Sequence, residues 1–179
     1  QNLTALNYTP DGNHILTACS HGDIHEWSIQ SGENTRNFHS QRLQVTSLAM
    51  AADHSRMLMV SDDDPHHYVI KEWDLITQTC RYVYVLPDAE ITAACYKPDK
   101  SVIFAATNTG EVVAWSTLTG EQINTYRSEE NVPLSSLMIQ AISEQENYII
   151  AAEDGTIYVW AENNEFPIRR INSLSLIHI

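Results

Sequence analysis

The sequence predicts an all-β fold made of four copies of one four-stranded antiparallel sheet, placed one after another along the chain. The first indication is the spacing of Trp27, Trp73, Trp115 and Trp160, which are 46, 42 and 45 residues apart. The second is that each tryptophan ends a similar phrase, in which a polar turn precedes a strand-like run. A repeat of about 40 to 45 residues is typical of the blades of a β-propeller, which bury their apolar faces against neighbouring blades.

The phrase AAEDGTIYVW, residues 151–160, shows the repeat most clearly. Residues 153–155 carry a turn signal, and residues 156–160 alternate polar and apolar side chains as a half-buried strand does. The phrases SHGDIHEW, DDDPHHYVIKEW and TNTGEVVAW end at Trp27, Trp73 and Trp115 in the same way. We therefore expect a hairpin in each repeat, with the four tryptophans at equivalent positions on the third strands.

Turn signals separate the other strands of each repeat. The first repeat turns at Pro10-Asp11-Gly12 and the third at Lys97-Pro98-Asp99-Lys100, where proline precedes a turn-forming residue. We predict four blades at about residues 3–38, 45–85, 91–126 and 134–171. Their strands are expected at 3–8, 14–18, 24–28, 34–38, 45–50, 57–61, 68–74, 80–85, 91–96, 102–106, 112–116, 122–126, 134–139, 148–152, 156–160 and 166–171. Residues 172–179 continue no repeat, and we expect this tail to lie outside the native fold.

Composition limits the classes of partner. The chain has 10 Lys and Arg against 23 Asp and Glu, a formal net charge of -13, so it offers no basic face for nucleic acid or for an anionic membrane. Neither a membrane span nor a signal peptide is recognisable, and we expect a soluble, intracellular protein. Cys19, Cys80 and Cys95 lie in strand-like runs without Cys-x-x-Cys spacing, which predicts buried thiols and neither a disulfide framework nor a zinc site.

The four repeats resemble WD repeats over nearly the whole chain. Each runs through a strand, a Pro-Asp-Gly-like turn, a second strand, an Asp-Gly-like turn and a third strand that ends in tryptophan. Thr-Gly or Ser-Gly then follows. The resemblance implies a β-propeller, whose ring most often has seven blades, so four blades would make a partial ring. In that family an Asp six residues before the Trp joins a hydrogen-bonded set with His and Ser or Thr. Only Asp154 holds this place, and His21, His67 and Thr109 stand there in the other repeats. These degenerate repeats would be held mainly by packing.

More narrowly, the phrases GDIHEWSIQSGE, VIKEWD, TNTGEVVAW and AAEDGTIYVW, in that order, are similar to the second propeller of the cilia- and flagella-associated protein 57 family. That family comprises axonemal scaffolds with WD-repeat propellers followed by a long coiled coil, associated with inner dynein arms and their regulatory complexes. The resemblance implies a non-catalytic scaffold in the cytoskeleton of a cilium or flagellum, with axonemal dynein-associated subunits among its partners. The alternatives are a WD-repeat adaptor of another intracellular complex and a propeller enzyme completed by further blades.

WD-repeat proteins often bind partners through the rim formed by the turns between second and third strands and by the connections between blades. We therefore predict that this rim binds other proteins. The charge of -13 suggests that at least one partner surface is basic, with affinity that weakens as salt rises. The candidate rim residues are Ser20, His21, His66, His67, Asn108, Thr109, Glu153 and Asp154.

Two groups of side chains carry metal-binding atoms, but for each group an arrangement without a metal ion is favoured. The run 62–67 contains three aspartates and two histidines, yet Pro65 breaks any helix, and a solvated acidic loop explains the run. In the cluster of His21, Asp23, His25 and Glu26, a turn and alternating strand faces would separate the side chains. We predict no metal site.

The sequence contains no catalytic motif that we can recognise. It has no nucleophile on a strand-to-helix elbow and no Gly-rich phosphate loop. Glu129-Glu130 is a pair of acids in a blade-to-blade connection, where a solvated loop is the favoured interpretation. We therefore predict no catalytic residue, no cofactor and no enzymatic activity.

Overall fold

In the computed structural model, residues 2–39, 44–64, 67–128, 132–141, 146–152 and 155–172 are described, with backbone alone at 63–64, 67, 140–141 and 146–152. These residues form strands, and none of them forms a helix long and apolar enough to cross a membrane. The strands are β1 (Leu3–Tyr8), β2 (His14–Cys19), β3 (Asp23–Ser28), β4 (Asn34–His39), β5 (Gln44–Met50), β6 (Arg56–Asp64), β7 (His67–Asp74), β8 (Thr79–Pro87), β9 (Ile91–Tyr96), β10 (Val102–Thr107), β11 (Glu111–Ser116), β12 (Gln122–Arg127), β13 (Leu134–Ala141), β14 (Glu146–Ala152), β15 (Thr156–Ala161) and β16 (Arg169–Asn172).

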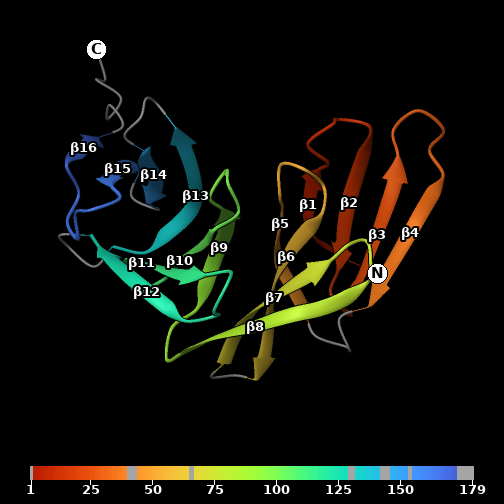
Figure 1. The fold of residues 1–179 in the computed structure, drawn as a ribbon, viewed down its shortest axis with the longest axis horizontal. Coiled ribbons are helices and arrows are strands. Elements are labelled where there is room, and N and C mark those ends of the chain that lie inside the picture. The colour runs from red at the N-terminus through yellow and green to blue at the C-terminus, as the bar shows by residue number, and fades with distance from the viewer. Residues whose placement is uncertain are drawn as a thin grey trace, which may run out of the picture.

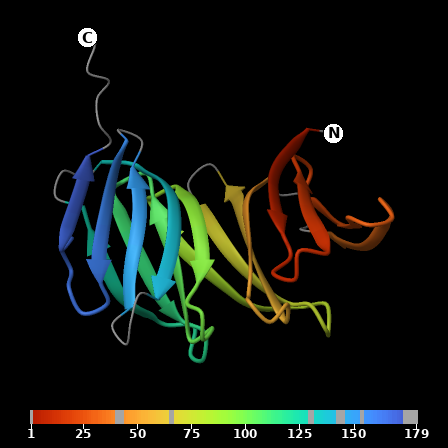
Figure 2. The same ribbon diagram turned by 90° about the horizontal axis from the view of Figure 1, so that it is seen from above.

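These strands make four antiparallel sheets, β1–β4, β5–β8, β9–β12 and β13–β16, each with its strands in sequence order. We call them blades 1 to 4. Figure 1 shows the blades following one another from the red end of the chain to the blue end, and Figure 2 shows the same succession from above. The first strands of consecutive blades contact one another, β1 with β5, β5 with β9 and β9 with β13. This succession of radial four-stranded sheets is the arrangement of propeller blades, as the repeats predict.

The four tryptophans occupy equivalent positions, which confirms the period deduced from the sequence. Each is the penultimate residue of the third strand of its blade. Trp73, Trp115 and Trp160 each pack into the apolar core shared with the preceding blade. Trp27 belongs to the first blade and is 37% exposed, whereas Trp115 is 4% and Trp160 0% exposed. The tryptophans are therefore packing residues between blades, and the burial of each depends on contact with the preceding blade.

Three apolar cores hold the blades together, one at each junction between consecutive blades. At the junction of blades 2 and 3, for example, Ile70 and Tyr84 from blade 2 meet Ile103 and Trp115 from blade 3. Burial of this apolar surface is the main favourable term in the stability of such a fold. On the first strand of blade 1, the exposed side chains include Leu3, Leu6 and Tyr8.

The structure corrects three details of the sequence-based expectation. The acidic residues 62–64 are not a loop, because β6 continues to Asp64 and its backbone pairs with that of β7. The last strand begins at Arg169 and ends at Asn172, so residue 172 belongs to blade 4 and not to the tail. Cys80 lies in a strand but is exposed, because it is on the outermost strand of blade 2, where no further strand covers it. Cys19 is buried as expected.

Candidate interaction surface

The turns between second and third strands of blades 1, 3 and 4 each place a glycine in the same backbone conformation. The amide of Gly22 donates a hydrogen bond to the carbonyl of Cys19 at 2.9 Å, and the amide of Gly110 donates one to the carbonyl of Thr107 at 3.3 Å. Gly22, Gly110 and Gly155 have φ angles of 86°, 83° and 79°. Glycine reaches this left-handed region without the clash that a Cβ atom would cause. The glycine of repeats 1, 3 and 4 therefore sets the turn that presents the rim residues, whereas repeat 2 has no glycine between β6 and β7.

The rim residues that the structure describes lie on these turns. His21, Asn108 and Thr109 are exposed, and Ser20 is half-buried. The Ser20 hydroxyl and the Nδ1 atom of His21 are 3.2 Å apart and share a hydrogen bond. These side chains come from blades 1 and 3, as the equivalence of the repeats predicts.

The rest of the predicted rim is described less fully. His66, Glu153 and Asp154 lie outside the described residues. His67 is described by its backbone, which begins β7 and pairs with Asp64. The part that Asp154 would take in the expected hydrogen-bonded set with Trp160 therefore stays a prediction. The indole Nε1 of Trp160 donates a hydrogen bond to the carbonyl of Arg127 at 3.3 Å.

Hydrogen bonds fasten the connection between blades 2 and 3 to the rim turn of blade 3. The amide of Glu90 donates to Asn108 Oδ1 at 3.1 Å, and the amide of Asn108 donates to the Glu90 carbonyl at 3.0 Å. The Asn108 side-chain amide also lies 3.5 Å from Glu90 Oε2. Asp88, two residues earlier, has a φ of 65° and is exposed. The turn and the connection therefore form one preorganised surface, which the sequence does not show because the two segments are 18 residues apart.

Acidic side chains gather on this part of the rim. A shallow pocket of about 530 Å³ lies between the end of β8 and the rim turn of blade 3. Burial raises the pKa of the Tyr68 phenol, and the charges of Glu90 and Asp62 raise it further. The negative field of these carboxylates therefore acts on one region of blades 2 and 3. The pocket is lined by Leu86, Pro87, Asp88, Ala89, Thr109 and Glu111.

One arginine balances part of this charge. Arg127 Nε is 3.1 Å from Glu111 Oε1, and Arg127 Nη1 is 2.5 Å from Glu165 Oε1. The hydrogen bond with Glu111 is the main reason that the pKa of the Arg127 guanidinium is raised. This arginine is engaged by two carboxylates, so Asp62, Asp88 and Glu90 keep the surface acidic.

The rim of blade 1 has a different character because it carries histidines. His39 Nδ1 is 2.8 Å from Asp23 Oδ1, and His25 Nδ1 is 2.6 Å from Asn37 Oδ1. The hydrogen bond from His39 lowers the pKa of the Asp23 carboxyl. Each of these pairs joins β3 to β4, the next strand of the sheet, and no group of three potential metal ligands forms among the residues that the structure describes.

A second concave region lies on the inside of the arc, where the first strands of all four blades line a groove of about 510 Å³. Asn7 reaches across from β1 and donates a hydrogen bond to the Leu48 carbonyl at 2.8 Å. Thr92 does the same from β9 to the Leu134 carbonyl at 2.5 Å. The lining includes a thiol, Cys95, whose pKa burial raises to about 12, so this thiol stays protonated near neutral pH. Such a lining suits packing and hydrogen bonding more than acid–base chemistry.

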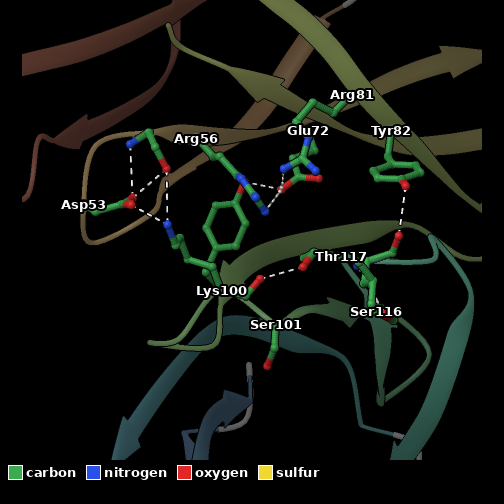
Figure 3. Close-up of polar contacts among 12 residues, drawn as sticks. Asp53, Arg56, Glu72, Arg81, Tyr82, Lys100, Ser101, Ser116 and Thr117 are labelled. Carbon is green, nitrogen blue, oxygen red and sulfur yellow. Dashed lines mark hydrogen bonds and ion pairs between the residues drawn. The ribbon is translucent and has the colours of Figure 1, made fainter.

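The face opposite the rim is held by polar contacts between blades (Figure 3). Lys100 of blade 3 pairs with Asp53 of blade 2, and His54 of blade 2 lies 3.9 Å from Asp11 of blade 1. His54 and Lys100 both have positive φ angles, 60° and 62°. They stand at the same turn position in consecutive blades, so blades 2 and 3 each contact the aspartate of the preceding blade.

Two buried glutamates, Glu26 and Glu72, are structural residues that the sequence analysis missed. They are 2% and 0% exposed, and each immediately precedes the tryptophan of its repeat. The signal was present, because HEW and KEW place a charge on the strand face that VAW and YVW fill with apolar side chains. Glu26 pairs with Arg36 at 2.7 Å.

Glu72 joins blades 2 and 3. It lies 3.2 Å from Arg56 and 4.0 Å from Arg81, and it accepts hydrogen bonds from the hydroxyls of Tyr84 at 3.2 Å and Tyr96 at 3.3 Å. Tyr96 belongs to β9 of blade 3, whereas the other groups belong to blade 2. Figure 3 shows Arg56 and Arg81 converging on Glu72. This network fixes blade 3 against blade 2.

Comparison with known proteins supports the same fold. No family model matches the chain. It is 29% identical over 166 residues to the Protein LST8 homolog of Drosophila melanogaster and 28% identical to that of Drosophila pseudoobscura pseudoobscura, and 89% of the chain aligns with 49% of each protein. It is 24% identical over 162 residues to Periodic tryptophan protein 2 of Arabidopsis thaliana, which covers 88% of the chain and 17% of that protein.

These relatives are WD-repeat proteins. Together with the four successive four-stranded sheets, they establish an all-β WD-repeat propeller fold for the chain. The chain spans about half the length of the two LST8 homologs that it matches.

Proposed function

We propose that the chain is part of a non-catalytic WD-repeat scaffold that binds other proteins through its rim. The observation that supports this most is the acidic surface of blades 2 and 3, where Asp88 and Glu90 stand beside the pocket and the rim turn is hydrogen-bonded to the blade connection. Preorganised, charged and exposed surfaces bind partners at low entropic cost and select them by complementary charge. The partner surface is therefore basic, and the protein acts inside the cell.

The alternative of an enzyme completed by further blades has weaker support. Catalytic groups of such an enzyme would gather at the inner groove, where ionisable side chains with matched pKa values would be needed. The described lining contains Tyr8, Cys95 and Tyr96, and burial raises the pKa of Cys95 and of Tyr96. These groups favour a packed channel wall.

The test neutralises the acidic rim in the full-length protein. Asp88→Asn with Glu90→Gln removes two charges, and asparagine tolerates the left-handed backbone of residue 88. The matched control, Glu33→Gln with Glu121→Gln, removes two exposed charges from turns elsewhere on the blades. We expect partners quantified by co-precipitation to fall for the rim variant and to be retained by the control, with the difference shrinking as salt is raised. Equal recovery with both variants would remove this surface from the proposal.

A narrower proposal places the scaffold in the axoneme of a cilium or flagellum, with inner-dynein-arm-associated subunits as partners. It rests on the similarity of the four repeat phrases to the cilia- and flagella-associated protein 57 family. The full-length protein with a fluorescent tag should then concentrate along axonemes and co-fractionate with inner dynein arms. A tagged protein that binds partners but stays out of axonemes would refute this location and leave the scaffold role intact.

A further inference from the structure

The outer strand of blade 2, β8, has a free edge at which another strand can pair. It has nine residues, whereas β4 and β12 have six and β16 has four. It is the last strand of its sheet. In an antiparallel ladder, alternate residues direct their N–H and C=O groups away from the neighbouring strand. Among the described residues, the outward groups of β8 make no backbone hydrogen bond to another segment.

The central residues of β8, 82–86, lack the features that protect edge strands. Natural edges are blunted by short length, charge or proline. β4 carries Arg36 and His39, and β16 is short and begins with two arginines. Residues 82–86 of β8 read Tyr-Val-Tyr-Val-Leu, without a charge, and Val83 and Val85 are 50% and 49% exposed. This edge is therefore long, apolar and open.

We propose that β8 pairs antiparallel with β8 of a second copy of this chain, so that the two second blades form one continuous sheet. The segment is self-complementary, because a two-fold axis at Tyr84 places Val83 opposite Val85 of the other copy. The same axis places Tyr82 opposite Leu86. Such β-branched and aromatic–aliphatic pairs are favourable cross-strand neighbours. A symmetric contact of this kind closes as a dimer. The contact adjoins the rim pocket at Leu86 but does not use Asp88 or Glu90, so it does not depend on the proposed function.

The register follows from the regular part of the strand. Glu72 pairs with Tyr82 while Trp73 pairs with Cys80, so Arg81 is the extra residue of a bulge. Pro87 has no N–H group to donate. Residues 82–86 remain for regular pairing, and their centre is Tyr84. Because each copy carries a charge of -13, salt should strengthen this contact, whereas it should weaken binding of a basic partner to the rim.

The first experiment measures mass by size-exclusion chromatography with light scattering over a range of concentrations. We expect the mass to rise from 20.2 kDa toward twice that value. Val83→Lys with Val85→Lys should raise the dissociation constant at least about tenfold. The matched controls are Ile123→Lys on β12 and Leu6→Lys on the uncovered side of blade 1, at sites 54% and 57% exposed, and they should leave the dissociation constant unchanged. The proposal would be overturned if the folded chain stayed monomeric at every concentration. It would also be overturned if Leu6→Lys made the chain monomeric and Val83→Lys with Val85→Lys did not.

The second experiment tests the register by disulfide formation. In a Cys80→Ser background, a mixture of Val83→Cys and Val85→Cys chains should cross-link faster than either chain alone, because these positions face each other across the two-fold axis. Directly opposed Cβ atoms lie close to the separation that a disulfide needs. Equal or slower cross-linking of the mixture would refute the pairing. Circular dichroism of each variant confirms that its sheets are intact.

Discussion

Removing the carboxylate of Glu72 should destabilise the junction between blades 2 and 3. Glu72 is 0% exposed and is the common partner of Arg56, Arg81, Tyr84 and Tyr96. Breaking a buried ion pair by removing one partner costs about 3–5 kcal/mol, because the remaining charge is left unpaired. The side chains of Arg56 and Arg81 are 23% and 30% exposed, so water can solvate part of their charge. We therefore expect Glu72→Ala to lower the free energy of unfolding by about 3 kcal/mol.

Urea unfolding followed by tryptophan fluorescence measures this loss. Trp115 reports on the junction, because its ring centroid is 6.0 Å from that of Tyr84. Glu72→Gln keeps an acceptor oxygen and removes the charge, so it should cost about half as much as Glu72→Ala, consistent with a hydrogen bond to a charged group. Glu90→Ala removes an exposed glutamate and should change stability by less than about 0.5 kcal/mol. A Glu72→Ala variant as stable as Glu90→Ala would refute the role of this network.

Two further predictions concern single contacts between blades. The Nε1 atom of Trp73 is buried without a hydrogen-bond partner among the described residues, whereas that of Trp160 donates to the carbonyl of Arg127. Trp160→Phe should therefore lower the free energy of unfolding by about 1 kcal/mol more than Trp73→Phe does. Thermal or urea unfolding measures the difference. The hydrogen bond from Lys100 lowers the pKa of the Asp53 carboxyl in the folded chain. Stability from this pair is therefore full above the unfolded-state pKa of about 4 and lost as pH falls through the lower folded-state value. Asp53→Asn should flatten that acid limb of a pH–stability profile, and an unchanged limb would assign acid unfolding to other carboxyls.

The repeat was readable from the sequence because its signals are local. Glycine at a left-handed turn, alternation along a strand and a tryptophan at a fixed place each depend on a few neighbouring residues, and they recur at the period of one blade. The expectation that β6 would end at residue 61 was wrong for the same reason. The acidic composition of residues 62–64 suggested a loop, but their backbone is paired with β7, and pairing is decided by the partner strand.

The candidate rim was predictable in part. The sequence identified the turns that carry His21, Asn108 and Thr109, because turn residues are local signals. It did not identify Asp88 and Glu90 as their neighbours, because the blade connection meets the turn of blade 3 only after β8, β9 and β10 have been placed. The same holds for Tyr96, which reaches Glu72 across 24 residues of sequence.

By itself, then, the sequence determined the fold class, the four blades and the equivalent positions of the tryptophans, since a repeated local pattern can bury its apolar faces only by stacking on copies of itself. Only the tertiary structure decided how those equivalent positions differ. Trp160 is fully buried and Trp27 is 37% exposed, although each is the penultimate residue of the third strand of its blade. The difference arises from whether a preceding blade packs against the residue. Burial, strand pairing and the local electrostatic field all depend on such neighbours from distant parts of the chain.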